Sequence, residues 1–174
     1  YNNAAVSLLK KSSNPKEKTD PILSEFPSSD FITRKEQFVQ IQRNESTSFK
    51  VCRLGGDKIY GPEYHFDLTD IADYKNKYIK VVISANIEVD GQLTASFTAK
   101  RDGKPVKNHS GENYWEGRDL EIMLKDTGKA YFVFSIPDFI QASDDCMISF
   151  WNRNGQSEIV ITSFQIKTVN NIWN

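Results

Sequence analysis

Aromatic and hydrogen-bonding side chains gather in residues 107–119, which read KNHSGENYWEGRD. A sugar ring presents an apolar CH face and a rim of hydroxyl groups. Its binding site therefore needs a flat aromatic side chain with donors and acceptors around it. This stretch supplies both kinds of group, and we take four of its residues as candidate ligand-binding residues: Asn113, Tyr114, Trp115 and Arg118.

A second polar cluster follows an apolar run near the C-terminus. It consists of Asn152, Arg153 and Asn154, which join the candidate ligand-binding residues. If both clusters lie at one end of the fold, they form a shallow saccharide site. The structural alternatives are that Trp115 folds back as a lid on the core and that the second cluster only makes a turn. Trp151 is expected to face inward.

Carboxylates in the same loop, Glu112, Glu116 and Asp119, raise the question of glycoside hydrolysis. That reaction needs two carboxyl groups across a cleft, one of them with a raised pKa. With 26% charged residues, this chain places carboxylates in any surface loop. The two histidines, His65 and His109, accompany no GxSxG, HExxH, GxxxxGK[ST] or GxGxxG motif. We predict that the domain is not an enzyme.

Three carboxylates recur at every third position, Asp67, Asp70 and Asp73. On a helical turn they would gather oxygen atoms that suit calcium, but the glycine and the terminal glutamate of an EF-hand loop are absent. We favour a solvated helical turn capped by Asp67 or Thr69. No cofactor is predicted, and a structural calcium ion is the alternative.

Two cysteines, Cys52 and Cys146, are too few for a disulfide framework or a structural zinc site. Each lies in an apolar run typical of a strand. We interpret them as buried thiols that pack as small hydrophobic groups. A bridge between them is the alternative if their strands are neighbours.

Composition excludes several partners. The chain has 174 residues with 22 basic and 23 acidic side chains and a net charge of -1, so no strong field attracts nucleic acid or an anionic membrane. No apolar run approaches the length of a membrane span, and we expect no direct membrane insertion of this segment. Because the chain begins at Tyr1, we expect it to be a piece of a larger parent polypeptide.

Apolar residues alternate with polar ones along several short runs, which is typical of antiparallel strands. The number and spacing of these runs predict an all-β fold over residues 31–174, either a sandwich or a barrel. We expect residues 78–89 and 93–99 to form a hairpin in which Val89 pairs with Leu93. The last two runs are expected to form a second hairpin around Asn154 and Gly155.

The first 30 residues differ from the rest. Residues 3–11 could form a short helix, and the following SSNPKEKTDPILSEFPSSD is dominated by serine, proline and charge. Such a composition is typical of a linker. We expect residues 1–30 to be a tether that lies outside the fold.

Six segments in order resemble the galactose-binding-like jelly rolls: FDLTDI, YIKVVISANIEV, NYWEG, AYFVFSIP, CMISFWNRNG and ITSFQI. The similarity covers about residues 38–166. It implies a two-sheet antiparallel β-sandwich of the jelly-roll kind, whose ligand, if any, is met by loops at one end or by a sheet face. Domains of this kind are common as carbohydrate-binding modules and accessory domains in extracytoplasmic bacterial proteins, and they often hold a structural calcium ion.

Two functional hypotheses follow. The first is a non-catalytic carbohydrate-binding accessory module that binds a polysaccharide or glycan and is tethered to a larger extracytoplasmic protein, in the periplasm or at the cell surface. The second is a structural or protein-interaction β-sandwich without a sugar ligand, in which a sheet face or an edge strand contacts a partner.

Overall fold

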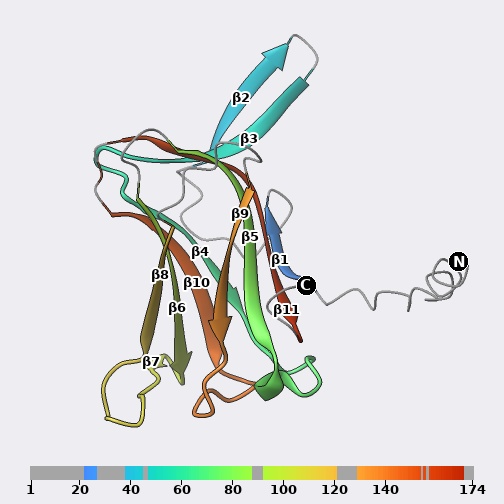
Figure 1. Cartoon of the computed structure of the whole chain (residues 1–174), viewed down its shortest axis with the longest axis vertical. Coiled ribbons are helices and arrows are strands. Elements are labelled where there is room, and N and C mark those ends of the chain that lie inside the picture. The colour runs from blue at the N-terminus through green and yellow to red at the C-terminus, as the bar shows by residue number, and fades with distance from the viewer. Residues whose placement is uncertain are drawn as a thin grey trace, which may run out of the picture.

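The structure is a β-sandwich. A computed structural model describes residues 22–26, 38–44, 47–87, 92–120, 129–153, 155 and 157–170. These residues form two antiparallel sheets with apolar side chains between them (Figure 1). Helical structure within the described ranges is limited to one 3₁₀ turn, η2 (Tyr74–Asn76). The predicted all-β, two-sheet antiparallel sandwich is confirmed.

Among the described strands, six form the first sheet, called sheet A. Its order is β2-β3-β11-β5-β9, and β1 pairs with a further part of β11. Hairpin β2–β3 extends beyond the sandwich (Figure 1). The strands of sheet A are β1 (Ile22–Phe26), β2 (Phe38–Asn44), β3 (Thr47–Leu54), β5 (Tyr78–Ile87), β9 (Lys129–Ser135) and β11 (Ile159–Val169).

Strand β1 falls inside the segment that we expected to be a tether. It pairs antiparallel with β11, and Glu25 lies opposite Gln165. On the same side of β11, strand β3 pairs only with residues 159–161, which leaves a length of edge that β1 occupies. Residues 22–26 therefore belong to the sheet, and the expectation that they lie outside the fold is wrong. The rest of the predicted tether, with its predicted helix, lies outside the described residues.

The second sheet, called sheet B, contains five of the described strands. Its order is β4-β10-β6-β7, and β8 pairs with the same edge of β6 as β7 does. Because β8 and β10 both run antiparallel to β6, they point in the same direction. The strands of sheet B are β4 (Tyr60–Phe66), β6 (Leu93–Arg101), β7 (Lys104–Pro105), β8 (Trp115–Leu120) and β10 (Asp145–Asn152).

Both predicted hairpins are wrong. Strand β5 lies in sheet A and β6 in sheet B, and Leu93 pairs with Asn152 and Leu120, so β5 and β6 do not form the predicted hairpin. Val89 itself lies outside the described residues. Strands β10 and β11 are likewise in different sheets. A strand with one apolar face can bury that face whether the next strand pairs with it in the same sheet or packs across the core in the other sheet. The alternation of apolar and polar residues is the same in both arrangements, so it does not predict which one forms.

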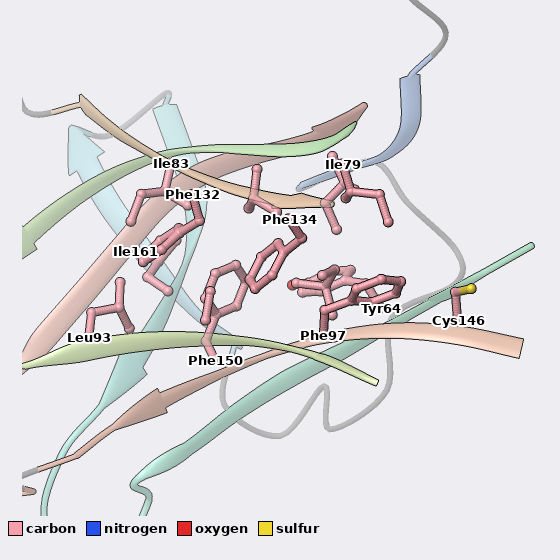
Figure 2. Packing of buried hydrophobic residues seen from close by; sticks show 14 of the residues in the cluster. Tyr64, Ile79, Ile83, Leu93, Phe97, Phe132, Phe134, Cys146, Phe150 and Ile161 are labelled. Carbon is pink, nitrogen blue, oxygen red and sulfur yellow. The ribbon is translucent and has the colours of Figure 1, made fainter. Parts of the chain in front are cut away.

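The core lies between the sheets. Figure 2 shows Ile79, Ile83, Phe132, Phe134 and Ile161 of sheet A pointing toward side chains of sheet B. The labelled side chains from sheet B are Tyr64, Leu93, Phe97, Cys146 and Phe150. Their rings meet closely, since the centroids of Phe97 and Phe134 are 5.9 Å apart across the two layers.

The connection into β10 is held by a buried ion pair. The Asp144 side chain is fully buried, and Arg101 donates from Nε and Nη2 to its two carboxylate oxygens at 2.8 Å each. The backbone N–H of Gln141 also donates to this carboxylate at 2.8 Å. Burial by itself would raise the pKa of Asp144, but these hydrogen bonds and the charge of Arg101 hold the pKa below its usual range. These bonds therefore attach the segment between β9 and β10 to the end of β6.

The two cysteines are free and buried. Cys52 lies on β3 of sheet A and Cys146 on β10 of sheet B. Burial raises the pKa of each thiol to about 12. The interpretation as buried thiols is confirmed, and no bridge joins them.

Candidate functional site

The outer face of sheet B carries two of the four exposed large aromatic side chains in the described residues, Tyr60 and Trp115, together with a group of small polar side chains. Alternation points Phe97, Ile148 and Phe150 into the core, so their sequence neighbours point outward. Strand pairing then arranges the outward residues in rows across β4, β10, β6 and β8. The first row is Tyr60, Trp151, Thr94 and Asp119; the second is Glu63, Ser149, Ser96 and Gly117; the third is His65, Met147, Thr98 and Trp115.

Trp115 begins the edge strand β8 and is 59% exposed. Its six-membered ring occupies the space above Gly117, because a Cβ atom on Gly117 would lie 2.3 Å from Cη2 and 2.7 Å from Cζ2 of the indole. The indole therefore leans along its own strand from the third row toward the second. Only glycine leaves room for this position of the ring.

The second row consists mainly of small side chains. Ser96 and Ser149 lie opposite each other on β6 and β10, and their hydroxyl oxygens are 2.7 Å apart. Gly117 extends the row to β8, and Glu63 extends it to β4. A shallow strip of hydroxyl groups thus lies beside an exposed indole.

The first row closes the other side of this strip. Tyr60 is 53% exposed and stacks on Trp151, with ring centroids 5.9 Å apart and planes 21° apart. Arg153 Nη1 donates to Asp119 Oδ2 at 2.8 Å. The Thr94 hydroxyl donates to the other oxygen of Asp119.

The two predicted clusters do not lie at one end of the fold. Trp115 pairs with Thr98 near the end of β6, whereas Asn152 pairs with Leu93 at its beginning. The loop before β8 is at the bottom of the view in Figure 1, at the end of the sandwich away from Asn152. The condition on which the predicted end-on site depended is not met.

Tyr114 packs inward, unlike its neighbour Trp115. Its ring meets Phe97 edge-on at 5.6 Å and Phe139 at 5.2 Å, and its hydroxyl donates to Glu116 at 3.0 Å. Burial, followed by the charge of Glu116, raises the pKa of Tyr114. Tyr114 covers the end of the core, which is the role considered for Trp115, and Trp115 is left on the surface.

The other two residues of the first cluster are exposed, Asn113 in the loop before β8 and Arg118 on the side of β8 away from the outer face. Asn113 is held by Lys107, whose Nζ donates to Asn113 Oδ1 at 2.7 Å. Arg118 alternates with Gly117 and Asp119, so it lies on the opposite side of β8, where it forms an ion pair with Glu116.

Asn152 is fully buried at the end of β10. Its Nδ2 donates to the carbonyl oxygens of Leu54 at 3.1 Å and Ser157 at 2.7 Å. These bonds connect sheet B to β3 and to the segment before β11, so this residue has a structural role. Asn154 lies outside the described residues. Trp151 is half-buried on the outer face, and the expectation that it faces inward is wrong because alternation places it opposite to Phe150.

The loop carboxylates are dispersed. Glu112 lies in the loop, Glu116 is bonded to Tyr114, and Asp119 lies on the outer face. Glu116 and Asp119 are three residues apart on one strand, which places them on opposite sides of it. They do not face each other as a glycosidase pair requires.

The helical turn predicted among these aspartates forms further along the chain than expected. Asp67 accepts hydrogen bonds from the backbone N–H of Thr69 at 3.0 Å and from its hydroxyl, and these bonds lower the pKa of Asp67. Asp73 precedes η2 with a φ of 55° and accepts a bond from Asn76 at 2.8 Å. The described ranges contain no group of three or more His, Cys, Asp or Glu side chains that could hold a metal ion.

Sequence reasoning missed Tyr60, Gly117 and the hydroxyl strip. A signal was present in β6, whose first three outward positions, Thr94, Ser96 and Thr98, are small and uncharged, while the fourth is Lys100 at the far end of the strand. A run of small outward side chains with hydroxyl groups on a central strand indicates a sheet face without bulky side chains above it.

The fold defines the class of this protein as an all-β, two-sheet antiparallel sandwich. No protein-family model and no curated protein matches the chain. Among solved structures, the chain is similar to the CBM22-1 xylan-binding domain from Paenibacillus barcinonensis Xyn10C. The sequence identity is 14% and the TM-score 0.49, with 87% of this chain and 97% of that domain covered.

No helix in the described part of the chain is long and apolar enough to cross a membrane.

Proposed function

We propose that this protein is a non-catalytic carbohydrate-binding module that holds a polysaccharide against the outer face of sheet B. The proposal depends on one observation, the exposed indole of Trp115 above Gly117 and beside the strip of Ser96 and Ser149. The site differs from the one expected from sequence, since it uses a sheet face instead of loops at one end.

Trp115 suits the apolar side of a sugar ring. A large exposed aromatic surface costs free energy in water, and a partner that covers it recovers this cost. In this position the indole leaves room beside it, because the second row contains only glycine and serine between β8 and Glu63. A sugar that stacks on Trp115 can thus approach the floor of the sheet.

The hydroxyl strip suits the rim of a sugar ring. Each serine hydroxyl is one donor and two acceptors, and it can rotate to match a ligand hydroxyl. The 2.7 Å contact between Ser96 and Ser149 uses one donor, so acceptor capacity remains on both oxygens. Such groups bind neutral hydroxyl-rich ligands and supply no acid, base or nucleophile activated for chemistry.

The test is isothermal titration against soluble xylan, mixed-linkage β-glucan, glucomannan and polygalacturonate. Wild-type protein should bind at least one of them, and Trp115→Ala should weaken that binding by about fivefold or more, since stacking on a large aromatic side chain is worth about 1 kcal/mol or more. Reducing-sugar release during the titration should stay at the background level.

Tyr131→Ala is the matched control. Tyr131 is 53% exposed, close to the 59% of Trp115, but it lies on sheet A. Its removal should leave binding unchanged. If the wild-type protein binds none of these polysaccharides, or if both variants lose binding equally, a structural or protein-interaction sandwich is favoured instead.

The setting of the domain follows from this function. Cell-wall polysaccharides such as those in this panel lie outside the cytoplasm, so a module that binds them would act in the periplasm or at the cell surface, attached to a parent polypeptide. Secretion of the full-length protein, followed by cell fractionation, tests this placement.

A further inference from the structure

We propose that the first row of sheet B contains a second sugar subsite, the Trp151 corner, which reads two adjacent hydroxyls of a neutral pyranose. The Trp151 corner is defined as Tyr60, Thr94, Asp119, Trp151 and Arg153. This inference rests on the proposed function and assigns part of the ligand contact to residues other than Trp115.

The aromatic part of the corner is a stacked pair. Tyr60 on β4 and Trp151 on β10 lie opposite each other in the sheet, with planes 21° apart. Trp151 is half-buried and Tyr60 is 53% exposed. The Arg153 guanidinium carbon lies 6.0 Å from the centre of the Trp151 ring. Tyr60 and the guanidinium thus both cover parts of the Trp151 ring, and the exposed aromatic surface of the corner is the ring of Tyr60.

The polar part of the corner is a fixed pair of opposite charges. Asp119 accepts hydrogen bonds from Arg153 at 2.8 Å and from the Thr94 hydroxyl. The backbone N–H of Arg153 donates to the carbonyl oxygen of Gln92 at 2.9 Å, which holds the residue against the start of β6. Carboxylate and guanidinium are thus positioned by bonds to β6 and to each other.

This pair adds little to stability, because an exposed ion pair in water contributes only a small net free energy. Its chemistry suits a ligand better. A carboxylate has about four acceptor sites and a guanidinium has five N–H donors, so neither group is saturated by the bonds that Asp119 and Arg153 make here. Adjacent sugar hydroxyls, each both donor and acceptor, can bond to both groups at once.

The charges in the first two rows of the outer face decide between neutral and acidic sugars. Asp119 and Glu63 both lie on this face, and Arg153 is already paired with Asp119. A uronic acid would bring its carboxylate toward these two and would be repelled. The corner therefore selects neutral sugars over uronates.

The corner is separate from Trp115. Asp119 is four residues further along β8, which corresponds to about 13 Å at about 3.3 Å per residue. The indole lies over Gly117, whereas Asp119 is held by Arg153 and Thr94, so each subsite has contacts of its own. The two subsites can thus be tested one at a time.

The test is isothermal titration of Arg153→Ala and Asp119→Asn with the same four polysaccharides. Both variants should bind the best neutral polysaccharide at least fivefold more weakly than wild type, with thermal midpoints within about 2 °C of it. Arg153→Lys should recover part of the loss, since the charge and a donor remain. Arg118→Ala is the control, because Arg118 is as exposed as Arg153, at 54%, but lies on the opposite side of β8.

The outcomes separate the two proposals. If Arg153→Ala and Asp119→Asn bind like wild type while Trp115→Ala loses binding, the corner is overturned and the proposed function stands. If polygalacturonate binds more tightly than the neutral polysaccharides, the inferred selectivity is overturned. If wild type binds none of the four, both proposals are overturned.

Discussion

The indole of Trp115 occupies the volume that a side chain at position 117 would need, and Gly117 leaves that volume open. The position of the Trp115 ring therefore depends on the missing Cβ atom at position 117 of the same edge strand. The backbone of Gly117 does not adopt a positive φ, so this glycine is needed for its missing side chain and not for an unusual backbone conformation.

Gly117→Ala should lower polysaccharide binding without destabilising the fold. The new Cβ would lie 2.3 Å from the indole, and the exposed ring would move aside. Alanine is tolerated in a strand with ordinary φ, so the free energy of unfolding should change by less than about 0.5 kcal/mol. Titration together with urea unfolding checks both parts. Wild-type affinity in this variant would show that the position of the indole is not important for binding.

Asn152→Ala should destabilise the protein by about 2 kcal/mol, because the carbonyl oxygens of Leu54 and Ser157 would lose their buried donor. Urea unfolding measures this change. Asn113→Ala, at an exposed asparagine, is the control and should cost less than about 0.5 kcal/mol. Equal effects of the two substitutions would contradict the structural role of Asn152.

Acid should weaken the fold through Asp144. Its pKa in the folded protein lies below the ordinary value of 3.8, so its ionised form stabilises the fold above that pH. This stabilisation is lost as the pH falls below 3.8 through the depressed folded value. Asp144→Asn removes the titrating group, so unfolding curves from pH 6 to pH 2 should show a smaller loss of stability in the variant. Parallel curves would mean that other carboxylates dominate acid unfolding.

Both thiols should be unreactive in the native protein. Burial raises the pKa of Cys52 and Cys146 to about 12, and the thiolate is the reactive form. A thiol-specific chromogenic reagent should label neither cysteine at pH 8 and both in guanidinium chloride. A reducing agent should leave the thermal midpoint unchanged, and a lowered midpoint would reveal a disulfide that the structure lacks.

Much of the local structure could be predicted from single strands. Alternation in residues 93–99 and 146–151 separates Phe97 and Phe150 from their outward neighbours, as the structure does. The same alternation places Trp151 on the outward face. We expected Trp151 to face inward because aromatic size was given more weight than periodicity. The first 30 residues have the composition of a linker, so β1 was not predicted. Its pairing depends on an open edge of β11.

The sequence by itself determined an all-β chain with one apolar face on each main strand, because side chains alternate with period two whatever the strand pairs with. It also identified Trp115 as a residue suited to sugar binding. The tertiary structure alone decided that β5 and β6 face each other across the core, and that Asp119 and Arg153 meet on one face. These relationships join residues far apart in the chain, and strand pairing across a sandwich leaves no periodic trace in the sequence.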